Sequence, residues 1–393
     1  MTTNRRAFLA GSAAAAAPAI LHGSPSSTAA NDRPAFGVIA AGGRGRYLAR
    51  YFAKLGAECV AVCDVREDCL QEAMKDFPQA KTYYHHEELL AQKGIDFTVC
   101  AGPDHWHLQH LIDSLNAGKD VYTEKPLSKT LQESVVMVEA VRRSGKVVQV
   151  GMQRRSAPSL IKAKKLVDDG VLGRITMVKA KWHWNTARPL NNSPFPGKVD
   201  WDRFLGPAPK RPMEPRRLRY WRWFRDYAGG NMTDQGTHLM DVVQWFTNSP
   251  PPRAATAMGF VAKNEGAEHP EVFSATFDNG SFLTCWELNY CNDFDDSWSI
   301  LFMGDQGTML LNDAGVTVWK EPWKDNRTPI LEEKAPVPIE THIQNFLDCL
   351  KTRKQPSCTV EIAQRAVAGP HLANIAMDLG RTVRLAEDLV TVS

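Results

Sequence analysis

Asp234, His238 and Asp241 have a spacing that suits chemistry on one face of a helix. Residues four apart share a helix face, so a carboxylate at 234 can orient an imidazole at 238. An unperturbed histidine titrates near pH ~6.5, which makes the pair a candidate for moving a proton. A surface Asp–His pair or a metal site would show the same spacing. No second His/Cys cluster accompanies it, so we predict no metal.

A second set of polar side chains follows short apolar runs in the first part of the chain. Helical patterns alternate with these runs, which predicts a mainly parallel sheet whose strands end at one edge. Ligands of such sheets bind outside the carboxyl ends of the strands. The four side chains are Asp64, Asp104, Lys125 and Gln153, after runs at 59–63, 96–101, 120–123 and 147–150.

A glycine-rich turn follows the first apolar run, at 36–40, and precedes a helical pattern at 47–55. Gly42, Gly43 and Gly45 would let the backbone approach a pyrophosphate at the helix N-terminus. Ala40 replaces the first glycine of the usual G-x-G-x-x-G, which weakens this motif. Asp64 strengthens it, because a carboxylate there accepts hydrogen bonds from ribose hydroxyls and repels a 2′-phosphate. NAD is therefore favoured over NADP, although Arg66 nearby suits a 2′-phosphate.

Further motifs occur in a fixed order along the chain. With the glycine turn and Asp64 they resemble the glucose–fructose oxidoreductase / inositol dehydrogenase / rhizopine-catabolism (Gfo/Idh/MocA) family of NAD(P)-dependent sugar oxidoreductases. The resemblance covers nearly all of the chain after residue 33. The motifs are Pro-Asp-His-Trp-His at 103–107, Glu-Lys-Pro at 124–126, Gly-Met-Gln-Arg at 151–154 and Gly-Gly-Asn-Met-Thr-Asp-Gln-Gly-Thr-His at 229–238.

The resemblance implies roles for particular residues. Lys125 would lie beside the nicotinamide and stabilise a developing alkoxide, and His238, oriented by Asp234, would take the hydroxyl proton. The predicted catalytic residues are thus Lys125, Asp234 and His238. The predicted cofactor-binding residues are Gly42, Gly43, Arg44, Gly45, Asp64, Pro103, Asp104, His107, Glu124, Lys125 and Gln153.

Aromatic residues are concentrated between the two motif-bearing parts. Tryptophan can stack on the apolar face of a sugar ring, although any single one can equally belong to the core. Six lie between 182 and 245: Trp182, Trp184, Trp201, Trp221, Trp223 and Trp245.

The predicted fold class is α/β, with a Rossmann-type doubly wound parallel sheet followed by an α+β domain whose large sheet is mostly antiparallel. We place an export signal and linker at 1–33, the nucleotide-binding domain at 34–155, and a substrate and oligomerisation domain at 156–393. Strands are expected at 175–184, 254–261, 271–277, 281–288, 298–304 and 308–312, and closing helices at 342–351 and 360–381. The segment 187–227 is expected to be a loop over the cleft. The free sheet face would form a homo-dimer or homo-tetramer, as the resemblance implies.

Composition narrows the classes of partner. The chain is 43% apolar and carries a net charge of +3, which argues against a nucleic-acid partner. An arginine cluster at 211–225 is expected to be salt-bridged surface or, less readily, an anion site. Eight cysteines include no CxxC spacing, so we expect neither a disulfide framework nor a zinc site.

The N-terminus resembles a twin-arginine export signal. Arg5-Arg6-Ala7-Phe8-Leu9 precedes a small-residue apolar run that is too short and weakly apolar for a membrane span. A disordered basic tail is the alternative. A twin-arginine route carries folded proteins, so a nicotinamide enzyme that uses it would leave the cytoplasm for the periplasm with its cofactor bound.

The sequence therefore predicts an exported oxidoreductase that moves hydride between a tightly held nicotinamide and a carbohydrate hydroxyl. A glycosidase or lyase that uses NAD for transient oxidation, elimination and re-reduction would carry the same motifs. A sensor that binds dinucleotide or sugar without catalysis is a third reading. Neither the sugar nor the oxidised carbon is specified by these patterns.

Overall fold

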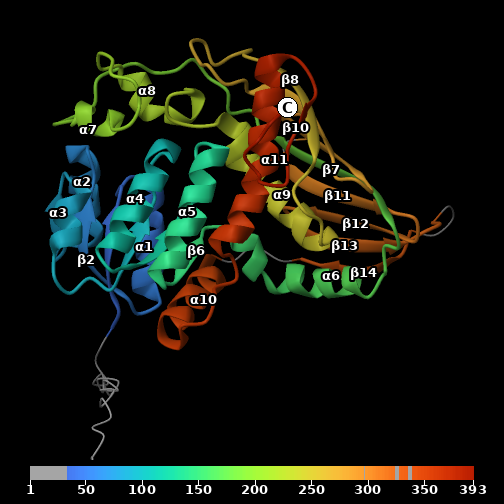
Figure 1. Ribbon diagram of the computed structural model, residues 1–393, viewed down its shortest axis with the longest axis horizontal. Coiled ribbons are helices and arrows are strands. Elements are labelled where there is room, and N and C mark those ends of the chain that lie inside the picture. The colour runs from blue at the N-terminus through green and yellow to red at the C-terminus, as the bar shows by residue number, and fades with distance from the viewer. Residues whose placement is uncertain (1–32, 296, 324–326, 335–338) are drawn as a thin grey trace, which may run out of the picture. The chain divides into compact units, whose positions relative to one another are not determined.

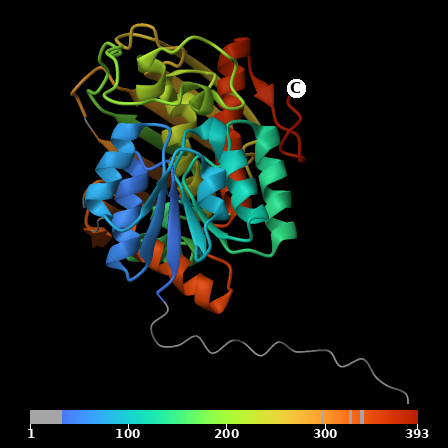
Figure 2. The same ribbon diagram turned by 90° about the vertical axis from the view of Figure 1, so that its left-hand side faces the viewer.

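Residues 35–150 form a parallel sheet of six strands, and helices cover both of its faces (Figure 2). The computed structural model describes residues 33–295, 297–323, 327–334 and 339–393. The strand order is β3-β2-β1-β4-β5-β6. The elements are β1 (Ala35–Ile39), α1 (Gly43–Lys54), β2 (Glu58–Cys63), α2 (Glu67–Asp76), β3 (Lys81–Tyr83), α3 (His86–Ala91), β4 (Phe97–Cys100), α4 (Asp104–Asn116), β5 (Asp120–Thr123), α5 (Leu131–Ser144) and β6 (Val148–Val150).

This order reverses direction at the boundary between β1 and β4. The chain moves outward from β1 to β2 and β3, and then returns to the other side of β1 for β4, β5 and β6. Loops on the two sides of such a switch point diverge, which opens a crevice at the carboxyl ends of the strands. The predicted Rossmann-type sheet is confirmed.

A nine-stranded sheet forms the second part, in the order β14-β13-β12-β11-β7-β10-β9-β8-β15. All neighbouring pairs are antiparallel except β7 and β10, so the predicted mostly antiparallel sheet is confirmed. Helices α9 and α11 lie on the face directed toward the first sheet (Figure 1). The elements are η1 (Gln153–Ser156), α6 (Pro158–Asp168), β7 (Ile175–His183), α7 (Trp201–Leu205), α8 (Pro215–Arg219), η2 (Trp221–Trp223), α9 (Gly230–Thr247), β8 (Ala254–Phe260), β9 (Val272–Asp278), β10 (Leu283–Asn289), β11 (Trp298–Gly304), β12 (Gly307–Asn312), β13 (Gly315–Lys320), β14 (Pro329–Glu333), α10 (Ile339–Thr352), α11 (Val360–Leu379) and β15 (Val383–Arg384).

The two closing helices depart from the predicted division of the chain. The sequence assigns both to the second domain, but α10 packs into the core of the first sheet, where the Phe346 ring lies 5.3 Å from Phe97. Its apolar residues Ile339, Ile343, Phe346 and Leu347 recur at helical spacing and form one buried stripe. Helix α11 begins in the core of the first sheet and ends in that of the second. The C-terminal helices therefore connect the two sheets.

The segment 187–227 differs from the bare loop that we predicted. It contains α7, α8 and η2 and encloses a small apolar cluster that includes Phe204, Phe224 and Tyr227, all buried. All eight cysteines are free thiols, in agreement with the sequence.

The predicted export signal at 1–33 lies almost wholly outside the described residues. Within the described part of the chain, no helix combines the length and apolarity needed to cross a membrane.

Candidate active site between two cavities

A cavity of about 360 Å³ lies over the carboxyl ends of β1, β2 and β4. Gly42, Gly43, Arg44, Asp64 and Pro103, five of the predicted cofactor-binding residues, line it. Segment 187–227 does border the cleft, as the sequence predicts. It contributes Arg203, Phe204, Leu218, Trp221 and Arg222.

The glycine turn forms the floor of this first cavity. Ala40, at the position of the missing glycine, adopts a left-handed φ of 68°, and its N–H donates to the Cys63 carbonyl at 2.9 Å. Gly42 caps α1 without a side-chain hydrogen bond, and a Cβ on Gly43 would meet no protein atom within 4 Å. A Cβ on Gly45 would lie 2.2 Å from the Ala40 carbonyl oxygen. The turn thus leaves space beside the uncapped end of α1, which suits a pyrophosphate.

Asp64 lies at the end of β2, where it lines the same cavity and is 8% exposed. Burial raises the pKa of its carboxyl group to about 6, even though the Arg66 N–H donates to it at 2.9 Å. The guanidinium of Arg66 is paired with Asp68 and lies 4.0 Å from the centre of the Phe195 ring. The cation that could have favoured a 2′-phosphate therefore already has a carboxylate partner.

A second cavity, of about 520 Å³, lies between the two sheets and shares Arg44 and Arg222 with the first. From the predicted site it gathers Arg44, Glu124, Lys125, Gln153 and His238. Its remaining walls come from Tyr47 of α1, from the second domain and from adjoining segments. They include Arg154, Trp182, Trp184, Gln235, Trp298, Asn312 and Asp313.

Lys125 and Asp234 form a buried ion pair at this cavity. The Lys125 Nζ donates to Asp234 Oδ1 at 2.6 Å and to the Asp234 carbonyl oxygen at 3.0 Å. Arg222 Nε donates to the same Oδ1 at 3.0 Å. Burial alone would raise the pKa of Asp234, but the charges of Arg222 and Lys125 hold it well below its usual range. Asp234 is therefore a permanent anion that fixes the position of Lys125.

His238 lies one helical turn after Asp234 on α9 and lines the second cavity. The predicted hydrogen bond to Asp234 is not formed, and within the described residues the His238 ring has no hydrogen-bond partner. Burial lowers the pKa of His238 well below its ordinary value, and the charges of Lys125 and Arg154 lower it further. The imidazole is thus neutral near pH 7 and can accept a proton. Asp241, the third member of the pattern, instead accepts from Arg155 Nε at 2.7 Å.

Arg44, Glu124 and Gln153 form a connected group where the cavities adjoin. Arg44 Nη2 donates to Glu124 Oε1 at 2.8 Å. With its amide oriented to satisfy both neighbours, Gln153 accepts from Arg44 Nη2 at 2.5 Å and donates to the Gly151 carbonyl at 3.3 Å. This group holds the Arg44 guanidinium in the walls of both cavities.

Gly45, Asp104 and His107 are predicted cofactor contacts that line neither cavity. Burial raises the pKa of Asp104 to about 6, and its Oδ2 accepts from the Gly229 N–H at 3.4 Å. The two ring nitrogens of His107 lie 2.6 Å from the Pro126 carbonyl oxygen and 2.8 Å from that of Gly102. His107 therefore braces the backbone that follows Lys125, behind the cavity wall.

The tryptophans divide between the cavities and the rest of the fold. Trp182 and Trp184 line the second cavity and Trp221 the first. The other three of the predicted group line neither cavity. Trp298, which the sequence does not single out, also lines the second cavity.

Arg222 is the functional candidate that the sequence missed. The sequence places it in an arginine cluster whose other members are mostly salt-bridged, for example Arg217 with Glu268 at 2.6 Å and Arg225 with Asp378 at 2.6 Å. Among the arginines of this cluster, only Arg222 contacts Asp234. Spacing within the cluster carries no signal of this, because the contact depends on how segment 187–227 folds over the cleft.

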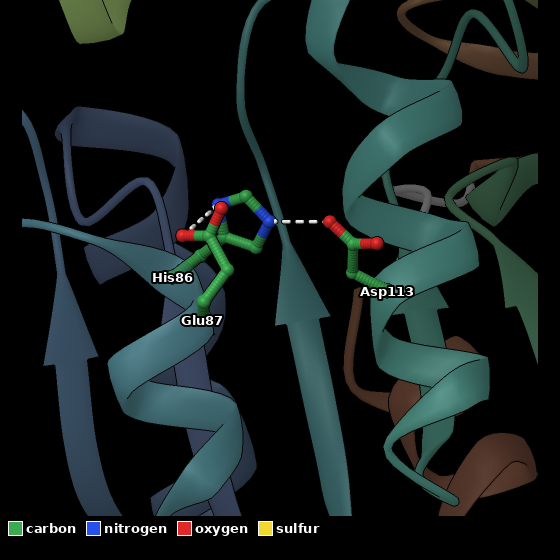
Figure 3. Close-up of side chains that lie close together, drawn as sticks. All are labelled: His86, Glu87 and Asp113. Carbon is green, nitrogen blue, oxygen red and sulfur yellow. Dashed lines mark hydrogen bonds and ion pairs between the residues drawn. The ribbon is translucent and has the colours of Figure 1, made fainter.

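His86, Glu87 and Asp113 bring three potential metal ligands together (Figure 3). His86 Nε2 lies 2.8 Å from Asp113 Oδ2, and its Nδ1 lies 3.0 Å from Arg203 Nη2. Arg203 also pairs with Glu87. A guanidinium thus takes the place that a metal ion would need, and we assign no metal to this cluster.

Comparison with known proteins identifies the family. Residues 35–152 match the Gfo/Idh/MocA family described as "Oxidoreductase family, NAD-binding Rossmann fold". Residues 158–253 match its companion, "Oxidoreductase family, C-terminal alpha/beta domain". The two matches together extend over more than half of the chain. The chain belongs to the Gfo/Idh/MocA oxidoreductase family, and its first domain is the NAD-binding domain of that family.

Individual relatives match this chain either over only part of its length or at low sequence identity. Inositol 2-dehydrogenase of Salmonella paratyphi B is 31% identical over 134 residues, which are 34% of this chain and 40% of that protein. The scyllo-inositol 2-dehydrogenase (NADP(+)) of Bacillus subtilis is 28% identical over 53% of this chain and 50% of its own length. The chain thus matches half or less of these relatives' length. The WlbA dehydrogenase from Bordetella pertussis, solved with NADH and UDP-GlcNAcA, is 21% identical, with a TM-score of 0.72 over 90% of this chain and 99% of that one, and shares the fold.

Proposed function

We propose that this protein transfers hydride between a nicotinamide dinucleotide and a hydroxyl group of a sugar, sugar derivative or glycoside. The observation that carries the proposal is that a neutral His238 and a Lys125 fixed by Asp234 line the same cavity. That cavity adjoins the glycine-turn groove through Arg44 and Arg222. The relatives named as inositol dehydrogenases support a polyhydroxylated substrate.

In this proposal Gly42, Gly43 and Asp64 hold the dinucleotide, and Lys125 faces its nicotinamide end. A bound nicotinamide supplies the position that accepts or donates hydride. Lys125 donates a hydrogen bond to the reacting oxygen, and its charge stabilises the developing alkoxide. His238 takes the hydroxyl proton at a ring nitrogen and returns it in the reverse direction. Asp234 acts through Lys125, which it positions by their 2.6 Å hydrogen bond.

NAD is the dinucleotide that we propose for this groove. Asp64 lines the cavity as a carboxylate that would repel a 2′-phosphate, and Arg66 is already paired with Asp68. Replacement of Asp64 by alanine should weaken NAD binding and narrow the preference over NADP. Equilibrium binding of both dinucleotides measures this. A wild-type protein that prefers NADP would contradict the assignment.

We further propose that the protein is exported by the twin-arginine route to the periplasm with its cofactor bound, as the residues at 5–9 suggest. Fusion of residues 1–33 to a reporter that is active only outside the cytoplasm tests this, with Arg5→Lys/Arg6→Lys as the control.

We also propose a homo-oligomer formed through the sheet face opposite α9. Met258 and Phe260 of β8 are 79% and 62% exposed, which fits a partner on this sheet. Light scattering tests the second proposal.

The deciding experiment monitors the dinucleotide that stays bound to the protein during purification, with no dinucleotide added. Protein purified without dinucleotide should release NAD or NADH on denaturation, and a sugar panel should change the absorbance of the bound cofactor at 340 nm. Empty protein without affinity for NAD would overturn the proposal. Release of an aglycone without net NADH formation would select the oxidation–elimination reading. If Lys125→Ala or His238→Ala left the biological function of the protein undiminished, this would favour a sensor that binds dinucleotide or sugar without catalysis.

A further inference from the structure

Arg154 stands apart from the other cations of the second cavity. It belongs to η1, the short helix that follows β6, lines the cavity and is 7% exposed. Lys125 and Arg222 are paired with Asp234, and Arg44 is paired with Glu124. Arg154 forms no salt bridge with any described residue, and its buried Nη1 has no hydrogen-bond partner.

The negative charges of two carboxylates, Asp241 and Asp313, act on Arg154, although neither carboxylate bonds to it. Asp241 is bound by Arg155, and Asp313 lines the same cavity. Neither forms an ion pair with the Arg154 guanidinium. A buried charge without a hydrogen-bonded counterion is costly to maintain, which indicates that its partner comes from outside the chain.

The walls around Arg154 fix the direction in which it can bind. Its guanidinium carbon lies 4.0 Å from the centre of the Trp298 ring and 5.4 Å from that of Trp182. Indole faces stabilise a guanidinium by cation–π contact and constrain its plane. The N–H edge is then left for a planar acceptor with two oxygens, which a carboxylate provides.

We propose that Arg154 binds a carboxylate group of the substrate, so that the substrate is a sugar acid such as a uronic acid or a uronide rather than a neutral sugar. This inference rests on the proposed function, because the carboxylate would anchor the ring whose hydroxyl faces Lys125 and His238. The unpaired guanidinium carries one positive charge that no carboxylate of the described residues neutralises in an ion pair. It therefore matches a carboxylate better than a phosphate dianion, which needs additional donors.

Equilibrium binding with NAD present, measured by calorimetry and tryptophan fluorescence, tests the inference. The probes are glucuronate, galacturonate and mannuronate, each against its parent hexose, together with glucose 6-phosphate. The wild-type protein should bind at least one uronate about 10-fold or more tightly than its hexose. Arg154→Met should remove that advantage by about 10- to 100-fold and change hexose binding by less than about twofold. Arg154→Lys keeps the positive charge but loses the two parallel N–H donors of the guanidinium. Its preference for uronate should lie between those of the wild type and Arg154→Met.

Arg188→Met removes an exposed arginine that lines neither cavity, and it should leave both affinities unchanged. Thermal unfolding of Arg154→Met reports its folding. Equal loss of uronate and hexose binding, no uronate preference in the wild type, or a preference for glucose 6-phosphate would each overturn the inference. Uronate binding without any hydride transfer would refute the proposed function and leave this inference standing. Hydride transfer restricted to neutral sugars would do the opposite.

Discussion

Lys125 and Asp234, 109 positions apart in the sequence, are joined by a 2.6 Å hydrogen bond between Nζ and Oδ1. Lys125 follows β5 of the first sheet and Asp234 belongs to α9 of the second part. The bond therefore ties the two halves of the candidate site together. Lys125 and Arg222 both donate to Oδ1 of this carboxylate, and Asp234 does not form the bond to His238 that the helical spacing suggests.

Replacing Asp234 by asparagine should reduce kcat/KM by about 100- to 1,000-fold, because Lys125 and Arg222 lose the charge that positions them. Removing one partner of a buried pair typically costs about 3–5 kcal/mol of stability, so thermal unfolding must be followed as well. Asp226→Asn is the matched control. Asp226 pairs with Arg211 and Arg217 and lines neither cavity, so this change should lower stability without lowering kcat/KM. Equal activity losses in the two variants would show that the Asp234 effect is only structural.

Lys125→Met should raise the pKa of His238. Burial is the largest cause of the lowered pKa and stays in place, so the value should rise toward the ordinary one without reaching it. Titration of the His238 ring by NMR measures the change directly. Because His238 must be neutral to accept a proton, any residual activity should be lost at a higher pH than in the wild type as the solution is acidified. Arg188→Met should leave the titration unaltered, and an unchanged or lower pKa in Lys125→Met would contradict the assigned interaction.

The sequence predicted the elements that carry most of the candidate site because their patterns are local. Buried runs before Asp64, Lys125 and Gln153 have the length and composition of strands, and a parallel sheet brings their ends to one edge. The same reasoning missed α2, β3 and α3. Strand β3 and helix α3 have only three and six residues, which is too short for a clear apolar period. Helix α2 does carry an amphipathic pattern, with Leu70 and Ala73 buried, and the sequence reading overlooked it.

The contacts within the site could not be predicted from the sequence, because they depend on packing between distant segments. Four-residue spacing places Asp234 and His238 on one helix face. It cannot reveal that a lysine from the other sheet and Arg222 from segment 187–227 approach the carboxylate. Arg154 was visible only as part of the Gly-Met-Gln-Arg motif. Its lack of a partner is a property of the folded cavity.

Gly45 and Gly43 should respond differently to alanine. A Cβ at Gly45 would lie 2.2 Å from a backbone oxygen, so Gly45→Ala must shift the turn and should cost about 1–3 kcal/mol of stability. A Cβ at Gly43 meets no protein atom within 4 Å, so Gly43→Ala should fold normally. It should weaken NAD binding by about 10-fold, since the methyl group enters the space beside the uncapped helix end.

Denaturant unfolding and NAD titration on both variants separate the two effects. If Gly43→Ala bound NAD as tightly as the wild type, the pyrophosphate would not lie at this turn. If Gly45→Ala were as stable as the wild type, the close approach of its backbone to Ala40 would not constrain the turn.

Ala40 is expected to be a point of strain that glycine relieves. Its φ of 68° lies in the left-handed region, which costs a residue with a Cβ roughly 1–2 kcal/mol, while glycine loses about 0.5–1 kcal/mol in chain entropy. Ala40→Gly should therefore stabilise the fold by up to about 1 kcal/mol, measured by urea unfolding. Ala41→Gly is the control, because the neighbouring alanine has no positive φ and its replacement should destabilise by about 0.5–1 kcal/mol. Equal destabilisation by both changes would mean that the turn holds Ala40 without strain, and that alanine in place of the first glycine of the G-x-G-x-x-G pattern stabilises the fold.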